Sequence, residues 1–315
     1  MSQSVKTSGS LGETGRRIIS GLILAAFFVF SFNYNGFYYL FLFLFVIFFA
    51  YIAIDEFYAM VTLNSTHKPY RKTGIAMGIF LITAIWIYSV KSMYVPGAFL
   101  YNYKFAYYLK LFELNFHTIT FLTLFALVYA FVRQLLRNKV EGAIYSIGAT
   151  MLGLLYIPLA FSHLFLLNTM PDGTFYIWLV AWATVMSDTA AYFSGRTFGK
   201  HKVGFAVSPN KTWEGYIGGL ILQTSSTLLF YFVISKLFRV PEITWPTLTI
   251  FAMLIYIVSV IGDLSESLIK RDSGVKDSGK LIPGHGGVLD LVDALMLTIP
   301  GSYYYIIFVR HIQNM

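Results

Sequence analysis

The stretch from Gly262 to Asp293 has the sequence GDLSESLIKRDSGVKDSGKLIPGHGGVLDLVD. It holds six of the fifteen acidic residues of the 315-residue chain. Apolar runs flank it at 246–262 and 288–309. Charge this dense between apolar segments indicates either a solvated loop or a functional site.

The whole chain is too apolar for a soluble domain. Its residues are 57% apolar and 12% charged, whereas roughly a quarter of the residues of a soluble domain are charged. Apolar runs long enough to cross a bilayer recur along the chain. We therefore expect an all-α polytopic membrane protein with about nine transmembrane helices. The expected spans are 18–33, 36–54, 73–93, 116–136, 143–168, 174–194, 214–237, 246–262 and 288–309.

The remaining segments suggest how the chain is organised. Residues 1–15 are polar and expected to be mobile, and the first apolar run lacks a cleavage site, which is typical of a signal-anchor. The polar-aromatic segment 94–115 resembles an interfacial segment. Pro158 predicts a kink in the fifth span. We expect two regions: an N-terminal membrane region of about four helices at 1–140, and a C-terminal catalytic membrane domain at 141–315.

Basic residues predict the topology. With a cytoplasmic N-terminus and nine spans, seventeen of the 23 Lys and Arg residues lie on the cytoplasmic side and six on the other. The loop 195–213 and the stretch 262–293 then face the cytoplasm together. The net charge of +8 is explained by this asymmetry rather than by nucleic-acid binding. The chain has no cysteine, which excludes disulfides and thiolate chemistry.

Asp188 lies inside the sixth expected span. A carboxylate in a membrane helix costs roughly 2.5–3.5 kcal/mol on insertion scales, so such a residue is expected to face a polar interior. Its position near the cytoplasmic end predicts a functional site there. A helix-packing carboxylate bonded to a hydroxyl is the alternative.

Two short basic motifs follow Asp188, at 195–202 (GRTFGKHK) and 208–215 (SPNKTWEG). Glycines allow close backbone approach, and hydroxyls with free N–H groups at a helix start can bind an anion. The spacing is not that of a Walker loop. An ordinary basic cytoplasmic loop is the alternative. The residues that would bind the anion are Arg196, Lys200, Lys202, Ser208, Lys211 and Thr212.

The acids of the 262–293 stretch occur at helical spacing. Asp263, Glu266 and Lys270 fall on one face of a helix continuing from the eighth span. Asp290 and Asp293 are three residues apart at the start of the ninth. Two carboxylates on one helix face repel unless a cation lies between them, and all-oxygen ligands suit Mg²⁺.

A glycine-rich turn, Pro283-Gly284-His285-Gly286-Gly287, connects the two acidic helix ends. Its backbone N–H groups precede a helix, which is typical of a phosphate site. His285 is either a capping residue or, beside Gly286 and Gly287, a phosphate contact.

Together these motifs resemble the phosphatidate cytidylyltransferase (CDP-diacylglycerol synthase) family. Segments 188–192, 195–200 and 208–215 are similar to other recurring motifs of that family. The resemblance covers about 180–295, whereas upstream of about 140 only length and hydropathy agree. The residues that match the family signature are Ser267, Ile269, Lys270, Arg271, Lys276, Asp277, Gly279, Ile282, Pro283, His285, Gly286, Gly287, Val288 and Asp290.

One position departs from the signature. The family pattern ends D-R-x-D, whereas this chain has Asp290-Leu291-Val292-Asp293. Leu291 therefore replaces the arginine, which leaves an inactive relative or a shifted substrate as alternatives. Both acids of the pattern are retained.

The resemblance implies transfer of a cytidylyl group from CTP to phosphatidic acid, giving CDP-diacylglycerol and pyrophosphate. The expected site lies at the cytoplasmic face of a bacterial inner membrane, in a cavity formed by the C-terminal helices. A homodimer is also implied, and no nucleic-acid partner.

The resemblance and the residues together suggest roles. Asp263, Asp290 and Asp293 would hold Mg²⁺, with a second cation such as K⁺ as an open alternative. Asp188 would be a further ligand or would position a basic side chain. The other expected catalytic residues are Lys211, Lys270, Arg271, Lys276, Asp277 and His285, and the expected nucleotide-binding residues are Arg196, Lys200, Ser208, Lys211, Thr212, Gly286 and Gly287.

Two rival functions stay open. A CTP-dependent transferase acting on another lipid phosphate or a lipid alcohol would need the same site. A transporter would also place acids in membrane helices, but near the bilayer midplane and often in paired broken helices. The acids here gather at one end of the chain, which disfavours transport.

Overall fold

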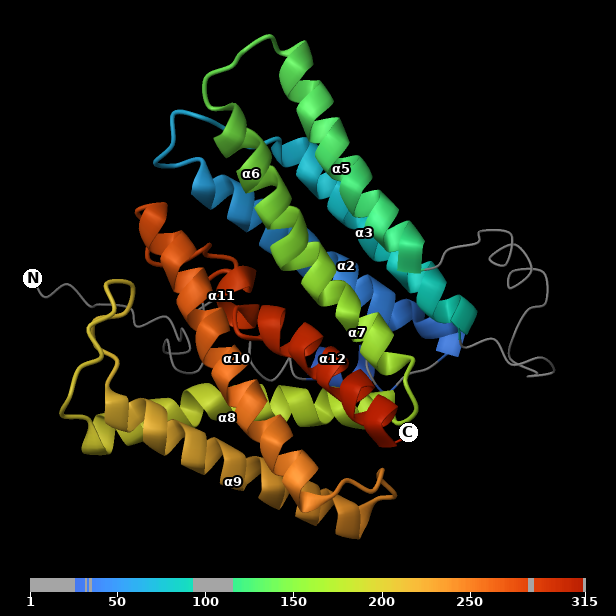
Figure 1. Ribbon diagram of the computed structural model, residues 1–315, viewed down its shortest axis with the longest axis vertical. Helices are drawn as coiled ribbons and strands as arrows, with labels where there is room; N and C mark the ends of the chain where they lie inside the picture. Colours follow the sequence, from blue (N-terminus) through green and yellow to red (C-terminus); the bar gives the residue numbers. More distant parts are fainter. Residues whose placement is uncertain (1–25, 32, 34–35, 93–115, 283–285, 314–315) are drawn as a thin grey trace, which may run out of the picture.

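The computed structural model describes residues 26–31, 33, 36–92, 116–282 and 286–313 (Figure 1). Throughout these residues the regular structure is helical. The β-pairing found there consists of two isolated bridges, Lys202 with Thr212 and Ile282 with Gly286. The all-α prediction is therefore confirmed.

The first half of the chain forms a group of helices drawn in blue to green in Figure 1. Pro158 lies in a π-helical turn, η1, because proline cannot donate the N–H that an α-helix requires. The predicted kink is thus a local change of helix type. The elements are α2 (Gly36–Val61), α3 (Arg71–Ser92), α5 (Phe116–Leu136), α6 (Ala143–Leu154), η1 (Leu155–Leu159) and α7 (Ala160–Asn168).

The second half crosses this group at one end. Figure 1 shows α8 and α9 side by side in the lower part, with α10 and α12 running between them and the first group. The long α10 confirms that the eighth span continues into the charged stretch. The elements are α8 (Gly173–Phe198), α9 (Trp213–Leu237), α10 (Trp245–Asp272), α11 (Val288–Val292) and α12 (Leu295–Gln313).

Seven helices in the described ranges are long and apolar enough to cross a membrane. The expected sixth span, α8, is 26 residues long, but polar and aromatic residues lower its hydropathy and it is not one of the seven. Most of the expected first span, 18–33, lies outside the described residues, as do 1–15 and 94–115. A polytopic membrane protein is confirmed, but the count of nine spans is not.

The ninth expected span, 288–309, lies within one helical stretch long and apolar enough to cross a membrane, Val288–Ile312, but this stretch is not a single uninterrupted helix. A turn at Asp293 and Ala294 separates α11 from α12, and the Asp293 side chain accepts a hydrogen bond from the Ala294 N–H at 2.6 Å. Gly262 of α10 lies against this turn. A Cβ atom at Gly262 would be 3.0 Å from Ala294 Cα, so glycine permits the close approach.

Small residues bring α8 and α9 together. A Cβ atom at Gly215 would lie 3.2 Å from Gly195 Cα, and one at Gly219 would lie 3.0 Å from Ala191 Cα. Membrane helices commonly use such residues to let their backbones approach. Thr212 caps the start of α9 by accepting a hydrogen bond from the Gly215 N–H at 3.2 Å.

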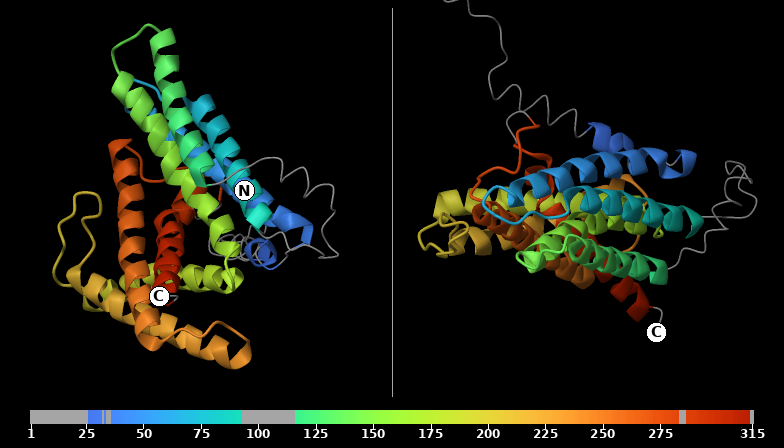
Figure 2. Two further views of the ribbon diagram at one scale, coloured as in Figure 1. Left: turned by 45° about the vertical axis from the view of Figure 1, so that its right-hand side comes forward. Right: turned by 90° about the horizontal axis from the view of Figure 1, so that it is seen from above.

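Loops from both halves meet at one end of the helices (Figure 2). Asn64 donates to the Asp272 carbonyl at 3.4 Å, which joins the α2–α3 loop to the end of α10. His67, in the same loop, packs against Gly142. Three of the segments that the basic-residue count places on one side of the membrane, the α2–α3 loop, the loop before α6 and the end of α10, therefore lie close together.

Candidate active site

A cavity of about 480 Å³ opens between α8, α9 and α10. Its volume is within the usual range for a small-molecule site. We call it the Lys211 cavity. Its lining residues are Asp188, Ala191, Tyr192, Gly195, Arg196, Asn210, Lys211, Thr212, Gly215, Tyr216, Val260 and Asp263.

Three sequence motifs meet in the Lys211 cavity. Asp188 and Arg196 come from α8, Lys211 and Thr212 from the start of α9, and Asp263 from α10. The structure thus brings together five predicted site residues whose sequence positions are far apart. The cavity offers both cationic groups for phosphates and carboxylates for a cation.

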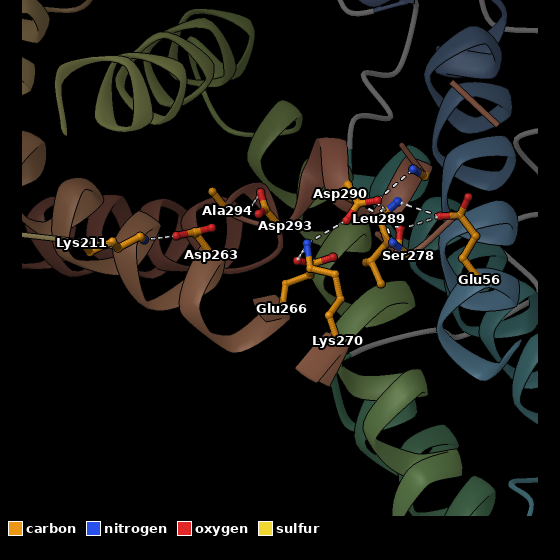
Figure 3. A network of polar contacts seen from close by, with 11 residues as sticks. Glu56, Lys211, Asp263, Glu266, Lys270, Ser278, Leu289, Asp290, Asp293 and Ala294 are labelled. Carbon is orange, nitrogen blue, oxygen red and sulfur yellow. Dashed lines mark hydrogen bonds and ion pairs between the residues drawn. The ribbon is translucent and has the colours of Figure 1, made fainter. Parts of the chain in front are cut away.

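Lys211 is the central basic residue of this cavity. Its ammonium group forms an ion pair with the Asp263 carboxylate (Figure 3). It also lies 5.7 Å from the centre of the Tyr216 ring. Arg196 donates to the Tyr192 hydroxyl at 3.1 Å and is exposed. Both cations are therefore accessible from the cavity.

Three carboxylates interact electrostatically around Lys211. Asp188 interacts with Asp263, and Asp293 interacts with both of them. Asp293 belongs to the turn between α11 and α12 and also interacts with Lys270. It therefore lies between the Lys211 cavity and the second cluster of polar residues described next.

Asp290 is the centre of a second group, the Asp290 cluster, made of Glu56, Glu266, Lys270, Ser278 and Asp290 (Figure 3). The Asp290 carboxylate accepts from Lys270 Nζ at 2.8 Å, Ser278 N at 2.8 Å, Ser278 Oγ at 2.9 Å and Gly287 N at 2.8 Å. Four donors hold one carboxylate in place.

Lys270 connects two acids within the Asp290 cluster. Besides Asp290, it pairs with Glu266, which lies one helical turn earlier on α10 and is fully buried. The i, i+4 spacing expected from the sequence is therefore used. A lysine held between two carboxylates is fixed in position more firmly than an exposed one.

The residue types in these two groups suit a metal ion, but their side chains do not converge on one metal site. The carboxylates named above outnumber Lys211 and Lys270, and their oxygens are the donors that Mg²⁺ prefers. Within the described part of the chain, however, no three His, Cys, Asp or Glu side chains converge closely enough to hold a metal ion. Asp263 and Asp293 interact, but Asp290 is occupied by its four donors.

Other predicted residues lie around these two groups. Lys200 and Ser208 are in the loop before α9 but do not line the Lys211 cavity. Glu214 fixes this loop by accepting from the N–H groups of Lys200 and His201, both at 3.1 Å. Arg271 is exposed in the last turn of α10, and Lys276 and Asp277 are exposed beyond it. Gly286 has a φ of 91°, and His285 lies outside the described residues.

Glu56 of α2 was not predicted as a site residue. It accepts from the Val288 N–H at 3.1 Å and the Leu289 N–H at 2.9 Å, and Ser278 Oγ lies 3.3 Å away. Its only sequence signal is an acid near the end of an apolar run. The N-terminal region thus contributes directly to the Asp290 cluster.

Tyr156 was also missed. It belongs to the π-helical turn at Pro158, and its buried hydroxyl has no hydrogen-bond partner among the described residues. It lies within electrostatic range of the carboxylates of Asp293, Glu266 and Asp263. Such turns are frequent at functional sites, so the proline was a usable signal.

Leu291, which replaces the arginine of the family signature, lies on α11 with 38% of its surface exposed. The adjacent Val292 is buried, whereas Leu291 points outward. An arginine could therefore occupy this position without entering the core.

The fold and the candidate site define a polytopic membrane protein with a cavity that contains both acidic and basic side chains. Residues 15–309 match the cytidylyltransferase family. The chain belongs to that family, and the match favours an enzyme over a transporter.

Relatives agree with this family. A phosphatidate cytidylyltransferase of Thermotoga maritima is 32% identical over 231 residues, covering 73% of this chain and 85% of that protein. One of Haemophilus influenzae is 47% identical over 135 residues, covering 42% and 45%. One of Staphylococcus haemolyticus is 39% identical over 153 residues, covering 48% and 55%. The last two matches thus span about half the length of those relatives.

Proposed function

We propose that this enzyme transfers the cytidylyl group of CTP to phosphatidic acid at the cytoplasmic membrane face, giving CDP-diacylglycerol and pyrophosphate. The observation that carries the proposal is the Lys211 cavity, where three motifs from α8, α9 and α10 place cations beside carboxylates. The names of the relatives supply the substrates.

In the proposed reaction, an oxygen of the lipid phosphate attacks the α-phosphorus of CTP. The bond between the α-phosphorus and the oxygen that bridges to the β-phosphorus breaks, and pyrophosphate leaves. Negative charge is redistributed over the transferring phosphoryl group and the leaving group, so positioning and cations supply most of the catalysis. No covalent enzyme intermediate is needed.

Basic residues would divide these charges between them. Lys211 and Arg196, accessible in the cavity, would bind the triphosphate. Lys270, held between Glu266 and Asp290, would remain fixed near the reacting phosphates. The exposed residues Arg271 and Lys276 would contact the lipid phosphate. Asp277 would orient Lys276 or accept a hydrogen bond from a substrate hydroxyl. His285 and the Gly286 and Gly287 amides would bind phosphate.

Asp263 and Asp293 would hold Mg²⁺, with Asp188 as a further ligand or as a partner that positions Lys211. Bound Mg²⁺ would neutralise charge on the phosphates and the leaving group. For Asp290 to serve as a ligand, it would have to exchange one of its four donors. A second cation such as K⁺ is part of the same proposal.

A second hollow, of about 370 Å³, would accommodate an acyl chain. It lies beside α10 and the loop before α9, the elements that also build the Lys211 cavity. This arrangement would let a lipid phosphate reach the cavity while its chains stay in the leaflet. Most of the residues that line it are apolar: Phe205, Ala206, Val207, Ile261, Leu264, Ser265 and Leu268.

The test is an assay of the purified protein in lipid nanodiscs with labelled CTP. Phosphatidic acid, an isoprenoid phosphate and diacylglycerol are offered separately, each with Mg²⁺ or with a chelator. We expect CDP-lipid from phosphatidic acid in Mg²⁺ only. Product from another acceptor alone would favour the altered-substrate alternative, and no product from any folded sample would favour an inactive relative.

Two further expectations concern the assembly and its orientation. The family resemblance implies a homodimer in a bacterial inner membrane. Light scattering of the detergent-solubilised protein would give twice the 35.7 kDa chain mass if this is correct. Proximity of the α2–α3 loop, the Gly142 region and the end of α10 supports a common cytoplasmic side.

A further inference from the structure

Glu56 is separated from the residues it contacts by more than 220 positions in the sequence. Its two carboxylate oxygens divide their partners: Oε1 accepts from Val288 N, and Oε2 accepts from Leu289 N. A single side chain of α2 therefore holds the first residues of α11. Figure 3 shows it reaching across from its own helix to the signature segment.

Two glycines of the signature leave room for this carboxylate. A Cβ atom at Gly279 would lie 2.4 Å from Glu56 Oε1, and one at Gly287 would lie 2.6 Å from Glu56 Oε2. Both distances are shorter than any normal contact. The shape of the signature segment thus depends on an acid that the segment does not contain.

Ser278 connects Glu56 to Asp290. Its hydroxyl lies 3.3 Å from Glu56 Oε2 and 2.9 Å from Asp290 Oδ2, and it accepts from the Asp290 N–H at 3.3 Å. A serine hydroxyl carries one hydrogen, so the two carboxylates compete for it. A substitution of Glu56 should therefore alter the hydrogen bonds of Asp290, which pairs with Lys270.

We propose that Glu56 is a positioning residue of the active site, through which the N-terminal region holds α11 and thereby orients Asp290 and Asp293. This inference rests on the proposed function for its kinetic consequence. It predicts that the first half of the chain takes part in catalysis by placing groups, without itself touching the substrates.

The test compares Glu56→Gln with Asp55→Asn. Asp55 is the adjacent acid of α2, but it pairs with the exposed Arg71 away from the site. We expect Glu56→Gln to lower kcat about tenfold or more, with KM for CTP changed less than about threefold. Asp55→Asn should leave both constants within about twofold. Wild-type kcat in folded Glu56→Gln would overturn the proposal.

Glu56→Asp covers the case in which the glutamine variant does not fold. It keeps the charge but is one methylene shorter, so it cannot reach both N–H groups in the same geometry. We expect the aspartate variant to fold and to show the same selective loss of kcat. Unchanged kcat in this variant would also overturn the proposal.

A second readout does not depend on activity. Because the chain has no cysteine, Val292→Cys gives a single buried thiol on α11. We expect Glu56→Gln to speed maleimide labelling of this thiol about fivefold or more, because α11 opens more often, while Asp55→Asn leaves the rate unchanged. An unchanged rate in Glu56→Gln would overturn the proposal even if the wild type proved inactive, whereas wild-type inactivity alone would count against the proposed function.

Discussion

The Lys211 cavity and the Asp290 cluster each contain a lysine–aspartate ion pair, but the two pairs differ in solvent exposure. In the cavity, Lys211 and Asp263 keep 30% and 26% of their side-chain surface exposed. In the cluster, Lys270 and Asp290 keep 15% and 10%, and Asp290 has four donors. A lysine–aspartate pair is thus accessible to a ligand in the Lys211 cavity and fixed in position in the Asp290 cluster.

This difference in exposure distinguishes residues that would bind substrate from residues that hold a segment in place. Groups that bind substrate must exchange their partners, so a partly exposed ion pair suits that task. Groups that hold a segment must keep their partners, so a closed hydrogen-bond network suits that one. Substitutions in the two groups should therefore differ in their effects on turnover and on stability.

The largest expected effect on turnover is that of Asp263→Asn in the Lys211 cavity. Loss of this charge should lower kcat about 10²- to 10³-fold, because Asp263 is proposed to hold the Mg²⁺ that neutralises charge on the phosphates. Stability should change by less than about 1 kcal/mol, because the Lys211 pair is partly exposed.

Steady-state assays and thermal melts of Asp263→Asn would measure these two effects. Asp272→Asn, at the exposed end of the same helix, is the control and should behave as wild type. Full turnover in Asp263→Asn would show that the Lys211 cavity is not the site of the reaction.

Asp290→Asn should combine a loss of turnover with a loss of stability. Asparagine cannot neutralise Lys270, and its amide hydrogens would face donors. We expect unfolding to be easier by about 2–4 kcal/mol and kcat to fall about 10²-fold. Denaturant titration in micelles, beside the kinetics, measures both. A loss of turnover without any loss of stability would make Asp290 resemble Asp263 and erase the contrast.

Ser278→Ala should have an intermediate effect. It removes the hydroxyl shared by Glu56 and Asp290, but leaves the backbone donors in place. We expect a loss of about 1–2 kcal/mol in stability and about fivefold in kcat. Ser235→Ala, which removes an exposed hydroxyl of α9, is the control. An equal effect of both substitutions would show that Ser278 has no special role.

Leu291→Arg should have the smallest effect. The exposed position accepts arginine with a stability change within about 0.5 kcal/mol. If the added guanidinium assists phosphate binding, kcat/KM for CTP rises about two- to threefold. Leu237→Arg, which adds the same charge at the exposed end of α9, should not change it. A fall in kcat/KM at position 291 would show that leucine is required there.

Much of the fold and part of the site could be predicted from the sequence. Apolar runs located the membrane helices, and the i, i+4 spacing of Glu266 and Lys270 correctly placed both on one face of α10. The sequence did not indicate that a turn at Asp293 and Ala294 divides the ninth span into α11 and α12.

Other parts of the site have no local signal. Glu56 meets its partners only after chain segments more than 220 residues apart have packed together, and neither its neighbours nor its spacing indicates this. The glycines at 279 and 287 are visible in the sequence, but the carboxylate they accommodate is not. Tyr156 could be predicted only in part. Pro158 indicated a disturbed helix, but not which side chain would come near the acids.

Cytidylyl transfer is tested with CTP labelled at either the α- or the γ-phosphorus, with wild-type protein and phosphatidic acid in nanodiscs. Cytidylyl transfer predicts α-label in the lipid fraction and γ-label in pyrophosphate, in equal amounts. γ-Label in the lipid would mean phosphoryl transfer from CTP instead. That result, or the absence of α-label in the lipid, would contradict the proposed reaction.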